Sequence, residues 1–434
     1  MHSRSGTHAH IGVSVHVDRS HAVVVHGSAV VPVQPSAPAR ADLDGTIASA
    51  VSTAVGLTGN GPEAVTVDIS PMLLEAVLRR DSDLPRVAVV RIVPRAATDP
   101  ALARSPAEVV ERRVARRFTV PGGHDLLGNE LCPLDRGQLA AVCAELAAGT
   151  IRHVAIVGAG SQARPAHERD VADAIQAAVP GARISVASEY GGQGLVAREA
   201  TVVLDCALAV LTDRLLDRCE RTLRRLPSEI PLRVARGDGG YSTPSRIRAN
   251  PVVAFGAAEA LELCGAAYLE GLEDCRVLLR RGDAQVAGEV RRGLALVSPA
   301  EPAGVGTEIV VPTAVLAPEP DLTRDGVPSR PDVPVVRARH EPQLLACVGA
   351  AISQPTSWLD EVAFIESATE LESVRRDAEE RATAIVMANG AAPGTAYFAE
   401  ASTVAVPYSP SGTVRIRVHA AGAPDTGLAR PGPP

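Results

Sequence analysis

One segment of the sequence has the glycine spacing of a dinucleotide-binding loop. Gly158, Gly160 and Ala163 form the pattern Gly-x-Gly-x-x-Ala after a short apolar run, and Glu189 ends the next apolar run, as an acidic residue does in that kind of site. There a helix begins near the second glycine, so that its N-terminus faces the pyrophosphate. Pro165 would then lie in the second helical turn, where a proline costs about 3 kcal/mol. The sequence therefore predicts a loop, then a helix that begins near residue 167, and no bound NAD.

Five histidines near the N-terminus, together with Asp18, are a candidate metal site, because imidazoles and carboxylates are common metal ligands. The histidines are His8, His10, His16, His21 and His26. The side chains around Asp18 converge only if the turn there folds in one particular way, and an exposed histidine-rich tract is the alternative. We predict no metal site, and leave open whether these histidines bind a metal.

The cysteines do not have the spacing of a zinc or redox motif. The seven lie at positions 132, 143, 206, 219, 264, 275 and 347, without a Cys-x-x-Cys pair, which disfavours zinc ribbons and thioredoxin chemistry. We expect reduced, buried thiols, with Cys206 and Cys219 packed inside a helix. Three acidic residues, Asp125, Glu130 and Asp135, follow the turn at 122–123, where an acidic cluster and a solvated loop remain alternatives. The Gly-x-Ser-x-Gly signature of serine hydrolases does not occur.

The elements that must position these side chains alternate between strand and helix patterns in the first half of the chain. A hairpin is predicted from the β-branched runs 11–17 and 22–26. Further strands are predicted at 64–69, 86–93, 154–157 and 184–187, and helices at 42–55, 72–80, 135–148 and 167–179. Repeated strand–helix–strand units indicate an α/β fold with a mostly parallel sheet.

The second half begins with the longest periodic stretch, 198–226, which predicts a core helix. A helix at 259–269 and a strand pair at 277–279 and 286–290 follow, and then a proline-rich stretch, 300–334, which has the composition of a linker or a shortened loop. Thr369 and Glu372 have the spacing of a capping box for a helix that extends to residue 387, and alternation over 413–419 predicts a half-buried strand. From residue 422 onward we expect a frayed tail.

Composition excludes several classes of function. The chain has 434 residues, a net charge of −7 and no lysine, so all 43 basic residues are arginine. A P-loop and Schiff-base chemistry both require a lysine. The acidic balance disfavours nucleic acid as a partner, and we find neither an apolar run long enough to span a membrane nor a secretory signal. We therefore expect a cytoplasmic protein without nucleic-acid or membrane partners.

The order of short motifs along most of the chain resembles the A subunit, or N-terminal half, of the hydantoinase/oxoprolinase family. The resemblance rests on the shared order of these motifs. The matching pieces are Ile11-Gly12-Val13, residues 86–92, Pro121-Gly122-Gly123, Gly128-x-Glu130-x-x-Pro133-Leu134-Asp135, Pro165-Ala166-His167-Glu168, Ser188-Glu189-Tyr190-Gly191, Asp238-Gly239, residues 265–274, Pro334 to His340, residues 349–352, and Pro407-Tyr408 with residues 415–418.

This resemblance implies an actin-like ATPase fold of the ribonuclease H-like type, with duplicated lobes, here partly truncated and followed by a C-terminal α+β segment. It also implies the opening of a cyclic amide, such as a hydantoin or 5-oxoproline, usually with ATP and magnesium and together with a B-type subunit. We expect an N-terminal domain over 1–195, a second, truncated lobe over 196–330, a helix–strand segment over 331–422 and a tail over 423–434.

The two phosphate-binding hairpins of the family depart from its pattern Asp-x-Gly-Gly-Thr-x-x-Asp. Ser14 and His21 stand at the aspartate positions of the first hairpin, and Leu279 and Val286 at those of the second. Aspartates at these positions would hold the metal, and the glycines would let backbone N–H groups approach phosphate. We therefore expect that ATP and magnesium are not bound in the ordinary way.

Two functions are compatible with this pattern. The first is a hydrolase subunit that opens a cyclic amide, with Asp238, His167 and Glu189 as predicted catalytic residues and with His340 and Glu168 as further polar candidates. Its predicted cofactor contacts are Gly12, Gly282 and Arg281. The second is a non-catalytic pseudoenzyme that keeps the fold in order to bind a partner subunit.

Overall fold

The first sheet has the strand order of a ribonuclease H-like lobe. The computed structural model describes residues 9–33, 43–59, 61–94, 105–318, 332–406 and 409–425. Within them, β1 (Ala9–Val15), β2 (Ser20–His26) and β3 (Ala29–Val33) form an antiparallel meander, and β4 (Pro62–Asp68) and β9 (Leu232–Ala235) continue it in parallel. The full order is β10-β9-β4-β1-β2-β3, with β10 at Tyr241–Ser242. The predicted hairpin is confirmed, and it joins β1 to β2.

A second, entirely parallel sheet is inserted between β4 and β9. Its strands are β5 (Val87–Val93), β6 (Val114–Pro121), β7 (His153–Gly158) and β8 (Arg183–Val186), in the order β6-β5-β7-β8. Successive residues of β5 face opposite sides, because side chains alternate along a strand. Val90 and Ile92 pack with α4 (Arg136–Ala148) and α5 (Ala166–Ala178), whereas Val87 and Val89 belong to the main core. The helix predicted to begin near residue 167 is confirmed, one residue earlier.

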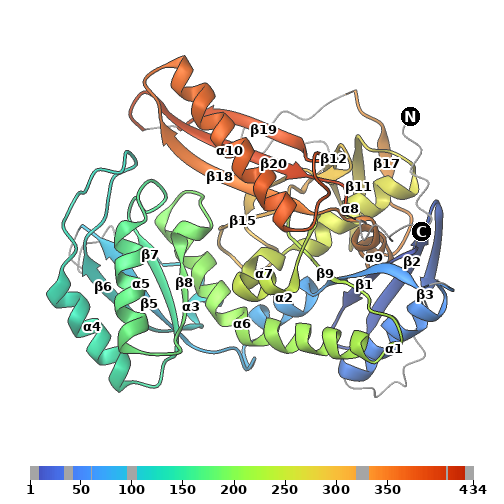
Figure 1. Cartoon of the computed structure of the whole chain (residues 1–434), viewed down its shortest axis with the longest axis horizontal. Helices are drawn as coiled ribbons and strands as arrows, with labels where there is room; N and C mark the ends of the chain where they lie inside the picture. Colours follow the sequence, from blue (N-terminus) through green and yellow to red (C-terminus); the bar gives the residue numbers. More distant parts are fainter. Residues whose placement is uncertain are drawn as a thin grey trace, which may run out of the picture.

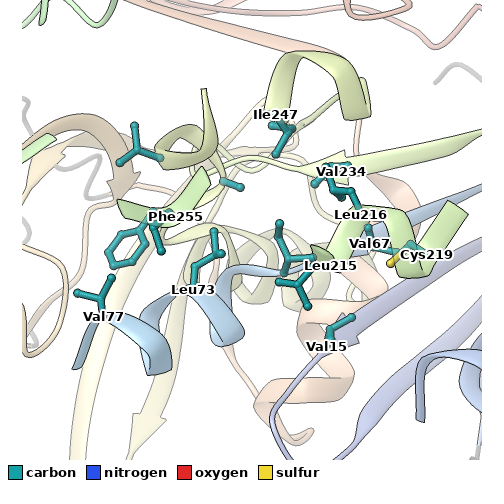
Figure 2. Packing of buried hydrophobic residues seen from close by; sticks show 14 of the residues in the cluster. Val15, Val67, Leu73, Val77, Leu215, Leu216, Cys219, Val234, Ile247 and Phe255 are labelled. Carbon is teal, nitrogen blue, oxygen red and sulfur yellow. The ribbon is translucent and has the colours of Figure 1, made fainter. Parts of the chain in front are cut away.

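Helix α6 (Leu195–Arg224) connects the two sheets, and this confirms the long core helix. It contacts β5, β7 and β8 of the inserted sheet and packs with α1 (Leu43–Gly56) and α2 (Ser70–Leu78) of the first lobe. Figure 2 shows Leu215, Leu216 and Cys219 of α6 beside Val67 and Val234 of the first sheet. The first sheet thus takes strands from both sides of residue 195, and the predicted domain limits stay a prediction.

The second lobe also contains an antiparallel hairpin, which joins β11 to β12. Its sheet has the order β13-β12-β11-β17, in which β11 (Cys275–Arg281) and β12 (Ala284–Arg291) are antiparallel and β17 (Val335–Arg337) is parallel to β11. Its remaining elements are α7 (Pro244–Ala249), η3 (Pro251–Ala254), α8 (Ala257–Leu269), β13 (Leu294–Ala295), β14 (Val297–Ala300), β15 (Ile309–Ala314), β16 (Ala317–Pro318) and α9 (Pro342–Ile352). Part of the predicted linker 300–334 therefore forms strand, in β15, β16 and the last residue of β14, while 319–331 lies outside the described residues.

The C-terminal segment is a three-stranded sheet covered by one helix (Figure 1). The strands β18 (Thr356–Phe364), β20 (Thr413–Ala421) and β19 (Tyr397–Ala405) lie in the order β18-β20-β19, and α10 (Ala368–Ala388) packs on them. The predicted capping box is wrong by two residues: Ser367 is the N-cap, and its hydroxyl accepts the N–H of Glu370 at 3.2 Å. Pro407-Tyr408, His8 and most of the predicted tail lie outside the described residues.

Three glycines hold helix α9 against both lobes. A Cβ atom on Gly12 of β1 would lie 1.9 Å from the carbonyl oxygen of Cys347 on α9. A Cβ on Gly265 of α8 would lie 2.1 Å from the carbonyl oxygen of Leu345, and one on Gly349 of α9 would lie 2.1 Å from that of Leu261. Backbones approach this closely only where no side chain intervenes. The predicted cofactor glycine Gly12 therefore has a packing role in this seam.

One stretch, Pro251–Leu269, is long and apolar enough to cross a membrane by length and composition alone. It comprises η3 and α8, and 67% of its apolar window is buried inside the protein. Its apolar residues are therefore those of a core helix that packs against α9.

We predict that Gly12→Ala and Gly349→Ala each lower the free energy of unfolding by about 3 kcal/mol, because the added methyl group meets backbone that cannot rotate away. Gly56→Ala, at the end of α1, is the matched control, since nothing lies within 4 Å of the added Cβ. Urea denaturation of the three variants measures the difference. Equal stability of Gly12→Ala and Gly56→Ala would show that the close contact between β1 and α9 does not require a glycine.

Candidate functional site

Both hairpins that correspond to the family's phosphate-binding motifs make hydrogen bonds or ion pairs within the protein. In the β1–β2 turn the N–H of His16 donates to the carbonyl oxygen of Arg19 at 3.0 Å, which closes the turn on itself. Val17 in this turn is 51% exposed. In the β11–β12 turn Arg281 forms an ion pair with Glu262 of α8 at 2.7 Å. The backbone donors and charges of the turns are thus partly committed to the protein itself.

A buried carboxylate lies at the end of β4, directly behind the first hairpin. Asp68 is fully buried, and its Oδ2 accepts the hydroxyl of Ser14 on β1 at 3.1 Å. Its Oδ1 accepts the N–H of Ser70 at 2.9 Å and the Ser70 hydroxyl at 2.6 Å, where α2 begins. Ser70 also accepts the N–H of Ala258 at 3.0 Å, so the second lobe takes part. Burial raises the pKa of Asp68 against these hydrogen bonds.

Two glutamates of α8 add further negative charge to this region. Burial raises the pKa of Glu262 to about 7, although Arg281 acts in the opposite direction, and burial also raises the pKa of Glu259. Asp68 contributes to the upward shift at both glutamates, because a nearby like charge disfavours ionisation. Asp68 and the two glutamates of α8 therefore interact electrostatically, and Glu262 is also ion-paired with Arg281.

A cavity of about 570 Å³ opens beside the first hairpin, within the size range of small-molecule sites. Its walls come from the β1–β2 turn, β2, β3 and the first half of α9. The lining residues are His16, Asp18, Arg19, His21, Ala22, Val23, Pro32, Val33, Glu341, Gln343, Leu344 and Cys347. The first turn of α9 lies in this wall, and N–H groups in the first turn of a helix have no acceptor within the helix.

His16 joins this cavity to the buried carboxylate. Its Nε2 lies 3.1 Å from the hydroxyl oxygen of Ser14, which in turn donates to Asp68. The ring of His21 meets that of His16 edge-on, with centroids 5.4 Å apart. Burial lowers the pKa of both imidazoles below 6.5, so both are neutral at pH 7. Within the described residues, no group of three metal-ligating side chains is close enough to hold an ion.

His167, one of the predicted catalytic residues, lies outside this cleft at the carboxyl ends of the inserted parallel strands. Its Nδ1 accepts the N–H of Gly123 at 2.9 Å, so its Nε2 carries the proton and donates to Glu130 at 3.0 Å. The ring of His124 lies 4.3 Å away, centroid to centroid. The neighbouring Glu168 is fully buried and accepts the N–H of Gly158 at 2.7 Å, which fixes the glycine loop from within the protein.

Glu189 and Asp238 have separate surroundings. Burial and then Asp205 raise the pKa of Glu189, which ends the short helix η2 (Ala187–Glu189). Asp238 is fully buried in the β9–β10 turn, where it pairs with Arg236 at 3.0 Å and accepts the hydroxyl of Thr356 of β18 at 2.8 Å. Burial acts against its charge, yet Arg236 and His419 hold its pKa below the ordinary value.

The three acidic residues after the turn at 122–123, for which a cluster and a solvated loop were alternatives, each make separate local contacts. Asp125 accepts the N–H groups of Leu127 and Asn129, both at 2.8 Å, and Asp135 is the N-cap of α4. Glu130 pairs with His167. His340 is exposed before α9, and Gly282 has nothing within 4 Å of an added Cβ. The structure does not bring the site residues predicted from the sequence together in one place. Their assignment to a site stays a prediction.

The predicted thiol packing is confirmed at the two helical cysteines. Cys206 and Cys219 are buried in α6, and burial raises the pKa of each to about 12. A thiol with such a pKa remains protonated and unreactive at neutral pH. All seven cysteines are free thiols.

The polar chain Asp68–Ser14–His16 and the glutamates of α8 were not predicted from the sequence. His16 directly follows β1, and its ring reaches back to the hydroxyl of Ser14 two residues earlier. Asp68, at the carboxyl end of the neighbouring parallel strand β4, completes the set. The available signal was a polar residue at the end of each of two apolar strands, and only the strand pairing brings them together.

Comparison with known proteins agrees with the family resemblance. Residues 98–179 match the hydantoinase/oxoprolinase N-terminal region, a segment that contributes to the inserted sheet. The fold is similar to that of an ATP-dependent caprolactamase from Pseudomonas jessenii, with a TM-score of 0.68 and 12% identity, over 95% of this chain and 87% of that one. It is also similar to acetone carboxylase, which carries out ATP-dependent acetone carboxylation, with a TM-score of 0.53 and 14% identity over 71% of this chain. No curated protein sequence matches the chain.

These similarities confirm the predicted fold class of duplicated actin-like lobes. The chain spans only 48% of the length of the acetone carboxylase chain. The activities named for the two solved structures belong to those proteins.

We predict that the stability of the protein falls as the pH rises from about 4.5 to about 7, partly through Glu262. Its pKa is higher in the folded chain than the ordinary 4.5, so the folded state holds the proton more tightly and is favoured below 4.5. The shift corresponds to about 3 kcal/mol. Glu262→Gln should remove this part of the pH dependence in thermal unfolding between pH 4 and 8, whereas Glu270→Gln, exposed at the end of α8, should not. Parallel profiles for Glu262→Gln and the unaltered protein would contradict the shift.

We predict that Asp238→Ala lowers the free energy of unfolding by about 3 kcal/mol, because it leaves Arg236 without its buried partner. Trp358, the single tryptophan, lies in β18 near His419, so its fluorescence should change with unfolding of this joint. Urea denaturation followed by tryptophan fluorescence measures the effect, with the exposed Asp283→Ala as control. An unchanged midpoint for Asp238→Ala would show that the buried pair contributes no stability.

Proposed function

We propose that the chain is an A-type subunit of the hydantoinase/oxoprolinase family that opens a cyclic amide of the hydantoin or 5-oxoproline type together with a B-type partner. The match of residues 98–179 to the N-terminal region of that family supports this proposal. The single observation that carries this proposal is the cavity beside the first hairpin, in which the neutral His16 is linked to buried Asp68. Similarity in fold to a caprolactamase, whose name refers to a cyclic amide, supports the same reaction class.

The chemistry of this cavity suits a small neutral ring. Hydrolysis adds the hydroxyl of water to the carbonyl carbon, breaks the carbon–nitrogen bond and delivers a proton to the nitrogen. An amide ring presents N–H donors and carbonyl acceptors, and neutral imidazoles such as those of His16 and His21 can both donate and accept.

The residues of the cleft do not fit ATP and magnesium in the manner of the family. The aspartate positions of the hairpins hold Ser14, His21, Leu279 and Val286. Asp68 already accepts three hydrogen bonds from serines, and Arg281 is paired with Glu262. We therefore propose a ring-opening reaction in which this cleft holds no ATP–magnesium, and no step of it is assigned to a nucleotide.

Among the residues predicted as catalytic from the sequence, His167 stays our second candidate for a proton-handling group. Its neutral imidazole donates to Glu130, whose side chain is 48% exposed, at the edge where ligands bind to parallel sheets. For Asp238 and Glu189 a supporting role is proposed, since Asp238 joins the first lobe to the C-terminal sheet and Glu189 lies near Asp205.

A second candidate function is a non-catalytic subunit that pairs with the partner and stabilises the assembly. The closed β1–β2 turn favours it, because a hairpin that bonds to itself offers no cradle. The glycine seam favours it as well, because backbone contacts between α9, β1 and α8 restrict movement of the lobes. For either function we propose a cytoplasmic hetero-oligomer without nucleic-acid or membrane partners.

We predict ring opening by the complex of this chain with a B-type subunit, and no dependence on ATP. The assay follows loss of hydantoin, 5-oxoproline and caprolactam by chromatography, with and without ATP–magnesium, while calorimetry measures ATP binding to the chain. Asp68→Asn should lower the turnover number by about 100-fold, and the exposed Asp83→Asn should not. A stable complex without ring opening would support the non-catalytic subunit instead. Micromolar binding of ATP–magnesium would contradict the proposed nucleotide-free cleft.

A further inference from the structure

The hydrogen bonds of Ser14 determine which nitrogen of His16 carries its proton. The Ser14 hydroxyl has one proton, and it donates this proton to Oδ2 of Asp68. The contact of 3.1 Å between the Ser14 oxygen and Nε2 of His16 must therefore have Nε2–H as the donor. The neutral imidazole consequently keeps its lone pair on Nδ1. Through Ser14, the buried carboxylate of Asp68 thus determines the tautomer of His16 on the cavity wall.

Asp68, Ser14 and His16 form a hydrogen-bonded series that runs from the interior of the protein to the cavity. Asp68 and Ser14 have no exposed surface, whereas His16 is half-buried and lines the cavity. The strands hold the order rigidly, because Ser14 pairs in register with Asp68 across β1 and β4 and with His21 across β1 and β2. This geometry positions a base, since a group that accepts a proton must be accessible while its orienting partner stays fixed.

We propose that His16 is the base that accepts a proton from water in the ring-opening reaction, and that Ser14 and Asp68 position it. This inference rests on the proposed function and names the group that acts in its cavity. Nδ1 of His16 takes one proton from the attacking water as the oxygen bonds to the carbonyl carbon. The carbon–nitrogen bond then breaks, and the same proton passes from Nδ1 to the leaving nitrogen. Atoms and charge balance without a further reactant.

Ser14 replaces a carboxylate in this arrangement. The family resemblance puts an aspartate at this position, where it would hold metal with the hairpin. A serine is shorter and neutral, yet it can accept from one group and donate to another. Ser14 can therefore link Asp68 to His16 by hydrogen bonds. Where an aspartate would hold a metal, the serine positions His16 as a proton acceptor.

Charged and titratable groups face His16 from several elements. Asp18 and Arg19 belong to its own turn, His21 lies on β2, and Asp68 acts through Ser14 from β4. Glu341 and Cys347 face the same cavity from α9. Burial lowers the pKa of His16, Asp18 raises it and Arg19 lowers it. The rate of ring opening should therefore fall on acidification through a pKa below 6.5, where His16 becomes protonated.

Two measurements on the full chain test this inference. Nitrogen-15 histidine NMR at neutral pH should detect an exchange-protected Nε2–H of His16, which Ser14→Ala removes and Ser14→Thr retains. In the ring-opening assay with the B-type subunit, His16→Gln should lower the turnover number at least about 100-fold, and Ser14→Ala should move the acidic limb of the pH profile. His26→Gln, exposed at the end of β2, is the matched control.

The outcomes separate this inference from the proposed function. Ring opening that persists at full rate in His16→Gln would overturn the inference and leave the proposed function intact. An Nε2–H signal that is unchanged in Ser14→Ala would overturn the positioning role. Absence of ring opening in the unaltered complex, with the protected Nε2–H present, would overturn the proposed function and with it the role of His16 as its base.

Discussion

The close contact of helix α9 with two neighbouring elements is the constraint on which the rest of the cleft depends. Glycines at positions 12, 265 and 349 let its backbone approach β1 and α8 without side chains between them. As a result, α9 brings one wall of the cavity against the first hairpin, and Cys347 contributes to that wall. A glycine that would serve phosphate binding in an ATPase hairpin serves packing at Gly12. A glycine at this position of the hairpin can therefore serve either phosphate binding or close backbone packing.

Charge in the cleft is organised around carboxyl groups rather than around cations. The chain has no lysine, and Arg281 of the second hairpin is paired with Glu262. Burial raises the pKa of Asp68, Glu259 and Glu262, and Asp68 adds to the upward shift at both glutamates, so ionisation of these groups is costly. A polyphosphate would add negative charge to this region. Proton exchange with a neutral ligand fits the same charges better.

Much of the fold could be predicted from the sequence because its strands and helices are strongly patterned. The β1–β2 hairpin, the helix after Pro165 and the long α6 were all anticipated from β-branched runs, proline and apolar periodicity. The candidate site was harder to anticipate, because Ser14 and Asp68 are 54 positions apart and meet only through parallel pairing of β1 with β4. The capping box of α10 was misplaced because Ser367 and Thr369 offer equivalent spacing, and only backbone geometry distinguishes them.

The choice between a hydrolase and a non-catalytic subunit depends on why Asp68 and its partners are kept. Replacing a buried aspartate alone leaves its hydrogen-bond donors unpaired, so its burial by itself is compatible with a purely structural role. Asp68, however, accepts three hydrogen bonds from two serines, one of which also contacts His16 at the cavity. A decayed site would be expected to lose first the groups that face open space, yet the polar chain ends in the cavity. This continuity from interior to cavity favours a working site.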